Sequence, residues 1–449
     1  MIQLRPYQTD AIARIRQTSQ FSRAVLVVSP TGSGKTTIAS EIARLTVARG
    51  KRVLWLAHRA ELVDQAFDRL REFGLIVGTV AAKTTRPPNP YAPVQVASVQ
   101  TLIARNLRPQ ADVLIWDEAH HAPSDLWSGL ATDYASSLLL GFTATPERSD
   151  GRGLGAVYTR IVTAATVRQL VELGSLVPCD IRAPSDRLRP GSIAQRPVDA
   201  WQQQAKGRRT IVFSPSIIAA EQHAQEFNDA DIPARVVTGA TPAGERAALL
   251  SDYRAGRLPV IVNVYVLTEG FDAPETNCVI LARGCGTAGT FLQMVGRGLR
   301  PAPGKVDCLL LDLHGVTYQH GRPEDDRIFS LDGRGIQRMG ESEYVEGSSC
   351  RVCGAPIEPG EACAECGTEP KPMRAPTVTG DPLVKYAAKR SEDSDKRAKT
   401  LARWIETARA SGYKEGWPLA KYKAVYGEWP GADVKAAAMV LVDEKERAA

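Results

Sequence analysis

A glycine-rich turn directly after a short apolar run constrains this chain more than any other feature. The run Val25–Val28 predicts a buried strand, and residues 30–36, Pro-Thr-Gly-Ser-Gly-Lys-Thr, predict a turn that opens into a helix. Backbone N–H groups at such a helix start suit phosphate oxygens, while Lys35 can reach the outer phosphates and Thr36 can help to hold magnesium. Ser29 stands where the strict G-x-x-x-x-G-K-[ST] pattern has glycine. The turn predicts a nucleoside triphosphate site; the alternative is a chance strand–turn–helix with a surface lysine.

Length and composition indicate an ordinary globular protein. The 449 residues allow two or three domains, and 43% hydrophobic and 24% charged residues are typical values. No apolar run reaches membrane-spanning length and the first residues do not resemble a secretory signal, so we expect a cytoplasmic protein without a membrane partner. From Lys371 to the end, 16 basic residues face 11 acidic ones, against 40 and 39 before it. This basic tail suits nucleic acid, although a solvated charged tail explains it equally well.

Apolar runs alternate with helical patterns through most of the chain, which predicts largely parallel sheets covered by helices on both faces. Two series of this kind predict two tandem α/β domains, residues 1–180 and 181–335, with the boundary inside the proline-rich stretch 165–204. The expected strands are Val25–Val28, Arg52–Leu56, Val94–Ser98, Val113–Trp116, Leu138–Phe142, Ile211–Phe213, Arg235–Val237, Val260–Val264, Val279–Leu281 and Cys308–Asp312. The expected helices include Thr36–Ala48, Glu61–Phe73, Ala219–Asn228 and Gly244–Ala255.

Two adjacent carboxylates end one of the expected strands. Asp117 and Glu118 follow Val113–Trp116, and ligands of open α/β sheets bind beyond strand ends of this kind. Asp117 can hold magnesium, directly or through water, and Glu118 can polarise a water for in-line attack on a γ-phosphate. An acidic pair after a strand is otherwise often a solvated cap, but the upstream glycine-rich turn favours the catalytic interpretation.

With the tetrad Asp117-Glu118-Ala119-His120, the chain resembles the superfamily two helicases of the DEAH type. The resemblance covers about residues 1–335 and rests on at least seven motifs in the expected order, with Ser29 and His121 as minor departures. By this resemblance Gln8 contacts adenine, and the threonine motif at Thr143 couples hydrolysis to domain movement. The further matching segments of the first half are Leu4–Gln8, Ala57–Arg59 with Leu62 and Gln65, and Ala97–Thr101, the last two of which are expected along the nucleic-acid backbone.

The second half carries the complementary motifs. Val212–Ser214 and Thr238–Gly239 resemble nucleic-acid contacts, and residues 268–272 resemble the motif that links the bound strand to the ATP site. Gln293–Arg300 fits the pattern Q-x-x-G-R-x-x-R, in which Arg297 and Arg300 reach across the cleft and Arg300 is the arginine finger; the alternative is two arginines that extend along a helix surface. The implied catalytic residues are Lys35, Asp117, Glu118, Gln293, Arg297 and Arg300. The implied ATP-binding residues are Arg5, Gln8, Thr31, Gly32, Ser33, Gly34, Lys35, Thr36, Thr37, Gly270 and Asp272, with Thr36 and Asp117 as magnesium ligands.

Four of the eight cysteines form a compact cluster. Cys350 and Cys353 form one C-x-x-C pair and Cys363 and Cys366 a second, with glycine after each pair. Four thiolates on two tight turns can surround zinc tetrahedrally, so residues 345–370 predict a structural zinc-ribbon-like module, with an iron–sulfur cluster as the alternative. The scattered cysteines Cys179, Cys278, Cys285 and Cys308 are expected to be free thiols, mostly buried.

A proline-rich linker is expected at 371–398, followed at 399–435 by a small helical module with interleaved aromatic and basic residues. Its rings, among them Trp404, Trp417 and Tyr422, suit either a miniature core or a platform for nucleic-acid bases. A helicase core followed by such modules resembles the RadD-like bacterial and phage helicases, and the core alone resembles the ATPase subunits of restriction enzymes.

The resemblance implies two RecA-like domains and an ATP-dependent DNA helicase or translocase in repair, recombination or replication, with possible partners among the proteins of those processes. Its cofactors are ATP, magnesium and zinc, and single-stranded or branched duplex DNA is the expected partner. RNA stays open because the family motifs contact backbone rather than bases. Two alternatives also stay open: a nucleic-acid clamp that uses ATP only as a switch, and the motor subunit of a restriction system.

Overall fold

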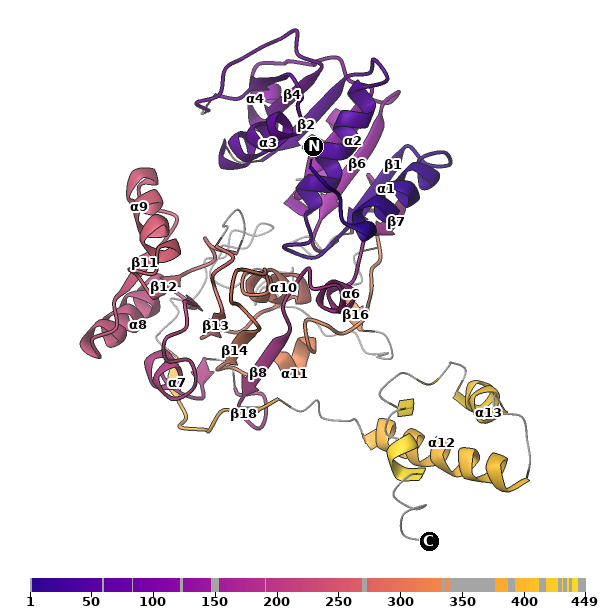
Figure 1. Cartoon of the computed structure of the whole chain (residues 1–449), viewed down its shortest axis with the longest axis vertical. Helices are drawn as coiled ribbons and strands as arrows, with labels where there is room; N and C mark the ends of the chain where they lie inside the picture. Colours follow the sequence, from indigo (N-terminus) through magenta and orange to yellow (C-terminus); the bar gives the residue numbers. More distant parts are fainter. Residues whose placement is uncertain are drawn as a thin grey trace. The chain divides into compact units, whose positions relative to one another are not determined.

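Two parallel sheets dominate the structure, which is a computed structural model (Figure 1). It describes residues 2–58, 60–82, 84–121, 124–146, 153–189, 191–268, 273–332, 336–338, 376–386, 392–411, 417–426, 430, 434–435 and 438–442. The chain divides into two units, residues 1–337 with 344–386 and residues 338–343 with 387–449. The first unit contains both sheets. We call the part through Ala164 lobe 1 and the part from Val177 lobe 2.

The sheet of lobe 1 has seven parallel strands in the order β3-β4-β2-β5-β6-β1-β7. Alternate residues of each strand enter opposite cores: Val25 and Val27 lie on the face covered by α1–α3, and Leu26 and Val28 on the face covered by α4 and α5. The strands are β1 (Ala24–Val28), β2 (Val53–Ala57), β3 (Val77–Val80), β4 (Val94–Ser98), β5 (Val113–Asp117), β6 (Leu138–Thr143) and β7 (Arg160–Thr163). The helices are α1 (Pro6–Thr18), α2 (Lys35–Val47), α3 (Ala60–Glu72), α4 (Val99–Ala104), the short 3-10 turn Ala119–His121 and α5 (Ser124–Asp133).

Lobe 2 repeats this plan in the order β11-β12-β10-β13-β14-β8-β18, with every pair parallel except the edge strand β18 on β8. Helices α7 and α8 cover one face, and α9 and α10 cover the other. The strands are β8 (Cys179–Ala183), β10 (Thr210–Phe213), β11 (Ala234–Val237), β12 (Val260–Asn263), β13 (Cys278–Leu281), β14 (Cys308–Asp312) and β18 (Val384–Lys385). The helices are α7 (Pro197–Gln204), α8 (Ile217–Asp229), α9 (Ala243–Arg254), α10 (Ala288–Gly296) and α11 (Thr317–His320).

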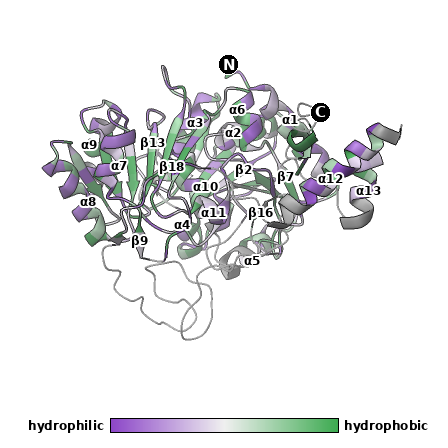
Figure 2. Cartoon of the chain, turned by 90° about the horizontal axis from the view of Figure 1, so that it is seen from below, coloured by the Kyte–Doolittle hydropathy of each residue, from purple (hydrophilic) through white to green (hydrophobic). Residues whose placement is uncertain are grey.

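The central strands of both sheets are mostly apolar and fully buried, which is the pattern of strands covered on two sides, and strands are mostly green in Figure 2. The prediction of two tandem α/β lobes with parallel sheets is thus confirmed. The second sheet begins at Cys179, inside the stretch where the boundary was expected.

The chain crosses between the lobes twice. On the way out, helix α6 (Val167–Glu172) begins at Thr166, whose hydroxyl caps it by accepting from the Gln169 N–H at 3.2 Å. On the way back, β15 (Arg327–Ile328), which pairs with β16 (Gln337–Arg338), precedes Leu331, whose carbonyl accepts from the Gly155 N–H at 2.9 Å. Lobe 2 is therefore joined to lobe 1 by the covalent connection through α6 and by a hydrogen bond at Leu331.

Residues 376–386 lie in the segment expected as a linker, yet they add to the edges of lobe 2. Strand β17 (Thr377–Val378) pairs with β9 (Ser192–Ile193), and β18 pairs with β8. Helices α12 (Glu392–Ser411) and α13 (Trp417–Tyr426) belong to the second unit, where Leu401 and Tyr422 form part of a small apolar core. None of the helices in the described ranges is long and apolar enough to cross a bilayer.

Candidate active site

The glycine-rich turn runs from the end of β1 to the start of α2, as the sequence predicts. Gly32 and Gly34 adopt φ values of +83° and +78°, a left-handed region in which side chains are strained. At Gly34 a Cβ atom would also lie 2.6 Å from Gln8 Nε2. Ser29, the departure from the strict glycine pattern, is fully buried, and its Oγ lies 2.6 Å from Ser33 Oγ. This contact between the two hydroxyl groups links the residue before the turn to Ser33 within it. Ser29 thus stabilises the conformation of the loop through its side chain.

The start of α1 lies against the same loop. Tyr7 Oη donates to the Ser33 carbonyl at 2.5 Å, and Gln8 Nε2 approaches the same carbonyl at 3.4 Å. Gln8 Oε1 accepts from the Arg5 N–H at 3.0 Å, and only 5% of Gln8 is exposed. Both ends of the Gln8 amide are therefore engaged with protein, and its contact with adenine stays a prediction. Sequence reasoning missed Tyr7, although an aromatic beside the glutamine was a usable signal.

The acidic pair lies at the end of β5, where Asp117 is the last strand residue. Glu118 has a left-handed φ of +51°, and its N–H donates to Asp117 Oδ1 at 3.1 Å. Its Oε1 lies 3.7 Å from Lys35 Nζ, so loop and acid face each other as predicted. Burial, together with the Glu118 charge, raises the pKa of Asp117 to about 7 against the opposing effect of Lys35.

A magnesium ion fits this donor set chemically. Asp117 offers a carboxylate and Thr36 a hydroxyl, the oxygen ligands that Mg²⁺ prefers. Since burial disfavours the Asp117 anion, a cation beside it would restore the ionised form. The described ranges contain no cluster of three or more His, Cys, Asp and Glu side chains that could bind a metal ion. Phosphate oxygens and water would therefore complete the coordination shell of the Mg²⁺ ion.

His120 connects the acid to both lobes. Its Nδ1 lies 2.9 Å from Thr143 Oγ1, and Thr143 Oγ1 in turn donates to the Thr145 carbonyl at 2.5 Å. Gln293 Nε2 of helix α10 lies 3.2 Å from His120 Nε2. One histidine thus joins the acidic motif, the threonine motif and helix α10 of lobe 2, which ends directly before Arg297.

The arginine segment of lobe 2 lies directly on the phosphate loop. A Cβ atom on Gly32 would be 2.9 Å from Arg300 Cγ and 3.5 Å from its Nε, and a Cβ atom on Gly296 would be 2.8 Å from Thr31 Cβ. Arg297, which caps the C-terminal end of helix α10, is 6% exposed. Contacts this close require glycine on both sides of the junction. The structure therefore brings Arg300 to the loop, as the arginine-finger interpretation requires.

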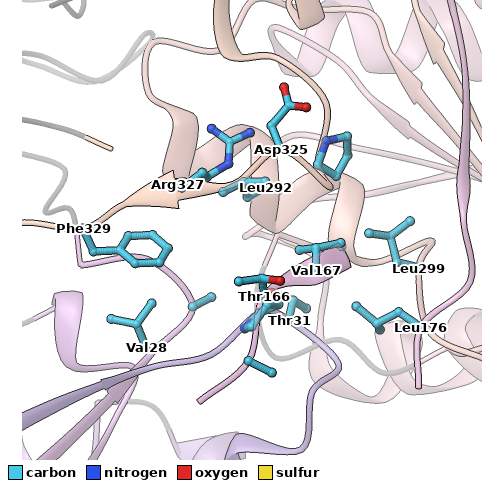
Figure 3. A pocket seen from close by; sticks show the side chains of 15 residues that line it. Val28, Thr31, Thr166, Val167, Leu176, Leu292, Leu299, Asp325, Arg327 and Phe329 are labelled. Carbon is cyan, nitrogen blue, oxygen red and sulfur yellow. The ribbon is translucent and has the colours of Figure 1, made fainter. Parts of the chain in front are cut away.

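An apolar pocket opens beside this junction, with side chains from both lobes in its wall (Figure 3). Val28 and Thr31 come from lobe 1, and Leu292 and Leu299 from lobe 2. Figure 3 shows Asp325 and Arg327 together on one side of it; the rest of the lining, including Val167, Leu176 and Phe329, is largely apolar. Such a lining offers few partners to phosphate groups, although Pro30 and Thr31 of the phosphate loop form part of it.

Several predicted residues are used differently. Thr37 Oγ1, expected at the nucleotide, accepts from Arg69 Nη2 at 2.8 Å. The Ser214 hydroxyl, in a segment expected at nucleic acid, is fully buried and lies 2.9 Å from His223 Nδ1, so a nucleic-acid contact of this segment stays a prediction. Gln100 is exposed, and its Nε2 donates to the His58 carbonyl at 3.0 Å, which joins the two segments of lobe 1 that are expected along the nucleic-acid backbone.

Other predictions lie outside the described residues: Arg59, Gly270, Asp272 and the four cysteines of the expected zinc module, Cys350, Cys353, Cys363 and Cys366. The remaining four cysteines are free thiols, with Cys278, Cys285 and Cys308 buried and Cys179 half-buried, as expected. In the second unit Tyr422 is 1% exposed and packs in the core, which favours the miniature-core interpretation for this ring. Lys421 Nζ lies 4.5 Å from the centre of the Trp417 ring and 5.4 Å from that of Trp404.

Two parallel-sheet lobes, a phosphate loop with an opposed acidic pair, and an arginine segment from the other lobe define a tandem RecA-like motor ATPase. Residues 1–148 match the family described as type III restriction enzyme, res subunit, and residues 194–302 match the helicase conserved C-terminal domain. The chain belongs to superfamily two of the helicases, which are ATP-hydrolysing enzymes.

Relatives of known description agree with this class. A 51.5 kDa protein of a Lactococcus phage is 29% identical over 365 residues, covering 76% of this chain and 77% of its own length. The Schizosaccharomyces pombe protein described as a mitochondrial ATP-dependent helicase, irc3, is 30% identical over 69% of this chain and 57% of its own length. The chain thus spans little more than half of this yeast relative.

Solved structures show the same fold. A fragment of an HsdR subunit of a type I restriction enzyme from Vibrio vulnificus YJ016 superposes with a TM-score of 0.58 at 23% identity, covering 73% of this chain and 66% of its own. The type ISP restriction-modification enzyme LlaBIII bound to DNA gives 0.52 at 16% identity, covering 69% of this chain and 27% of its own.

Proposed function

We propose that this chain is an ATP-dependent DNA translocase that opens duplex DNA or displaces bound obstacles during repair, recombination or replication. The observation that carries the proposal is the contact of Arg300 with the phosphate loop at Gly32, which makes one catalytic site from two lobes. Hydrolysis that needs both lobes couples chemistry to lobe movement. A Sulfurisphaera tokodaii relative, 26% identical, is described as the DNA 3'-5' translocase XPB2, which supports DNA as the track.

Each site residue then has a distinct role. The loop N–H groups and Lys35 bind the phosphates, and Lys35 exchanges its contact with Glu118 for phosphate oxygens. Glu118 orients the attacking water and takes its proton, while Thr36 and Asp117 would hold Mg²⁺, which neutralises phosphate charge when bound. Arg300 stabilises the charge of the transferring phosphoryl group from the second lobe. Gln8 is proposed to contact the adenine.

The most informative experiment compares ATPase stimulation by single-stranded DNA, duplex DNA, forked DNA and RNA, with a strand-displacement assay on the forked substrate. We expect the DNA substrates to raise turnover, and forked DNA to be separated in the presence of ATP. Stimulation by RNA alone would contradict the assignment of DNA. Stimulation by DNA without strand separation or displacement of a bound roadblock would favour the clamp that uses ATP as a switch.

A motor subunit of a restriction system is the second candidate, and the match of residues 1–148 to the restriction res subunit is the observation that favours it. Co-purification with a methyltransferase or a nuclease would support this candidate. The tetrad at Asp117–His120 and the four-cysteine segment instead favour a DEAH-type enzyme close to the RadD-like helicases. On that basis we place the protein in the cytoplasm, with replication or repair proteins as partners.

The cysteine segment is proposed to hold one structural zinc ion through Cys350, Cys353, Cys363 and Cys366. Metal analysis of the purified protein should find one zinc per chain, and Cys363→Ser together with Cys366→Ser should remove it. Iron with sulfide, or no metal at all, would contradict the proposal. Free Cys179 and Cys285 serve as controls, because their replacement by serine should leave the zinc content unchanged.

A further inference from the structure

One ammonium group ties three backbone carbonyls together at the end of the arginine segment. Lys305 Nζ donates to the carbonyl oxygens of Arg300 at 2.6 Å, Thr276 at 2.5 Å and Pro274 at 2.9 Å. Three bonds match the three N–H donors of a lysine ammonium. Burial lowers the pKa of Lys305 to about 8, so the group still carries its third proton at neutral pH.

These carbonyls belong to two different segments of lobe 2. Arg300 ends the segment that lies on the phosphate loop. Pro274 and Thr276 follow residues 268–272, the segment that resembles the link between bound strand and ATP site. The ammonium therefore joins the end of one motif to the end of the other.

Neighbouring contacts hold the same stretch of backbone from other directions. The Leu299 carbonyl accepts from the Val177 N–H at 2.9 Å, which attaches the segment to the connection between the lobes. At Gly298 a Cβ atom would lie 2.3 Å from Cys308 Sγ, so the backbone is pressed against β14. Beyond these two contacts, Lys305 anchors the Arg300 peptide itself.

We infer that Lys305 is a positioning residue, whose ammonium fixes the backbone that directs Arg300 to the phosphate loop. The inference rests on the proposed ATPase function. Charge-assisted hydrogen bonds are the stronger ones, and small displacements of a catalytic group reduce the rate while binding of substrate is retained. Loss of the ammonium also frees the Pro274 and Thr276 carbonyls, but its effect on turnover should act mainly through Arg300.

Arg208 offers a matched control in the same lobe. Its Nη1 donates to the Asn277 carbonyl at 3.0 Å and lies 2.6 Å from Asp307 Oδ1. Arg208 thus holds the loop that Lys305 also holds, through a charged side chain of similar length, and these contacts are with Asn277 and Asp307 rather than with Arg300. Arg208→Met tests what loosening of this loop alone does.

The experiment measures DNA-stimulated ATP hydrolysis in the full-length chain for wild type, Lys305→Met, Arg208→Met, Arg300→Ala and the double variant Lys305→Met with Arg300→Ala. We expect Lys305→Met to lower kcat about tenfold or more with KM for ATP changed less than about threefold. In the Arg300→Ala background the same substitution should change kcat less than about twofold. Arg208→Met should keep kcat within about threefold of wild type.

Two results overturn the inference: a wild-type kcat in Lys305→Met, or an equal loss of kcat with and without Arg300. A loss in Arg208→Met as large as that in Lys305→Met overturns it as well. If Lys305→Met does not fold, Lys305→Gln, which keeps two N–H donors, must show a reduced kcat with normal ADP binding. If wild type itself shows no DNA-stimulated hydrolysis, the proposed function fails rather than the role of Lys305.

Discussion

Gln293 Nε2 lies 3.2 Å from His120 Nε2, and this hydrogen bond joins helix α10 of lobe 2 to the acidic motif of lobe 1. His120 also lies 2.9 Å from Thr143 Oγ1 and 3.5 Å from Glu118 Oε2. A shift of α10 would therefore reach Glu118, the proposed catalytic base, through the single side chain of His120. This relationship provides a short physical route between lobe movement and the chemistry.

Removing the Gln293 amide should weaken the connection from α10 to Glu118 and leave the phosphate loop intact. We expect Gln293→Ala to lower DNA-stimulated kcat about five- to tenfold, since the loss of one neutral hydrogen bond is worth about 1 kcal/mol. Hydrolysis without DNA should fall less. Gln222→Ala on the exposed side of α8 is the control and should behave as wild type. Equal losses with and without DNA would argue against a coupling role for Gln293.

The contact between Gly32 and Arg300 can be tested through the glycine. Gly32→Ala combines a left-handed φ of +83° with a Cβ atom 2.9 Å from Arg300 Cγ, so we expect a loss of at least tenfold in kcat. Gly207→Ala is the matched control, because φ is +82° there and nothing lies within 4 Å of its Cβ position. Both variants should lose about 1 kcal/mol of stability. Wild-type hydrolysis by Gly32→Ala would show that Arg300 does not act at this point of the loop.

The proposed role of Glu118 as catalytic base should be separable from nucleotide binding. Glu118→Gln keeps the shape of the side chain but cannot take a proton, so hydrolysis should fall by at least about a hundredfold. ADP binding, measured by calorimetry, should stay within about threefold of wild type. The melting temperature should also stay close to wild type, because Glu118 is only partly buried and its ion pair with Lys35 is long at 3.7 Å. Retained turnover would assign the role of base to another group.

Stability should depend on pH through His223 of lobe 2. Burial lowers the pKa of His223 to about 4 from an ordinary value of 6.5, so between these values the unfolded chain binds a proton that the folded chain does not. The contribution of neutral His223 to the free energy of unfolding is fully present above pH 6.5. It is lost as the pH falls towards 4, at up to ~1.4 kcal/mol per pH unit. Urea unfolding of wild type and His223→Phe at pH 7 and pH 5 should show a smaller acid loss in the variant. Parallel losses would mean that His223 does not titrate in this range.

Sequence reasoning located the elements of the site because their signals are local. Val25–Val28 is apolar on both faces, and the glycines at 32 and 34 mark a turn that needs left-handed backbone. Contacts between segments that are far apart in the chain could not be predicted from such local signals. The hydroxyl pair of Ser29 and Ser33, the burial of Ser214 against His223 and the bond from Lys305 to Arg300 all depend on packing between elements.

Edge strands illustrate the same limit. β18 has two residues, and its sequence lies in a proline-rich stretch without a strand-like run. Its pairing with β8 depends on an available sheet edge rather than on its own propensity. A linker was therefore the natural expectation for residues whose structure is set by lobe 2.

The most direct test of the two-lobe site is single-turnover ATP hydrolysis by Arg300→Ala with single-stranded DNA present. An arginine supplied from lobe 2 is worth about three to five powers of ten in related phosphoryl transfer. We predict a loss of at least about a thousandfold in the rate of the chemical step, with ADP affinity within about threefold of wild type. Hydrolysis by Arg300→Ala at the wild-type rate would contradict a catalytic cleft shared between the lobes.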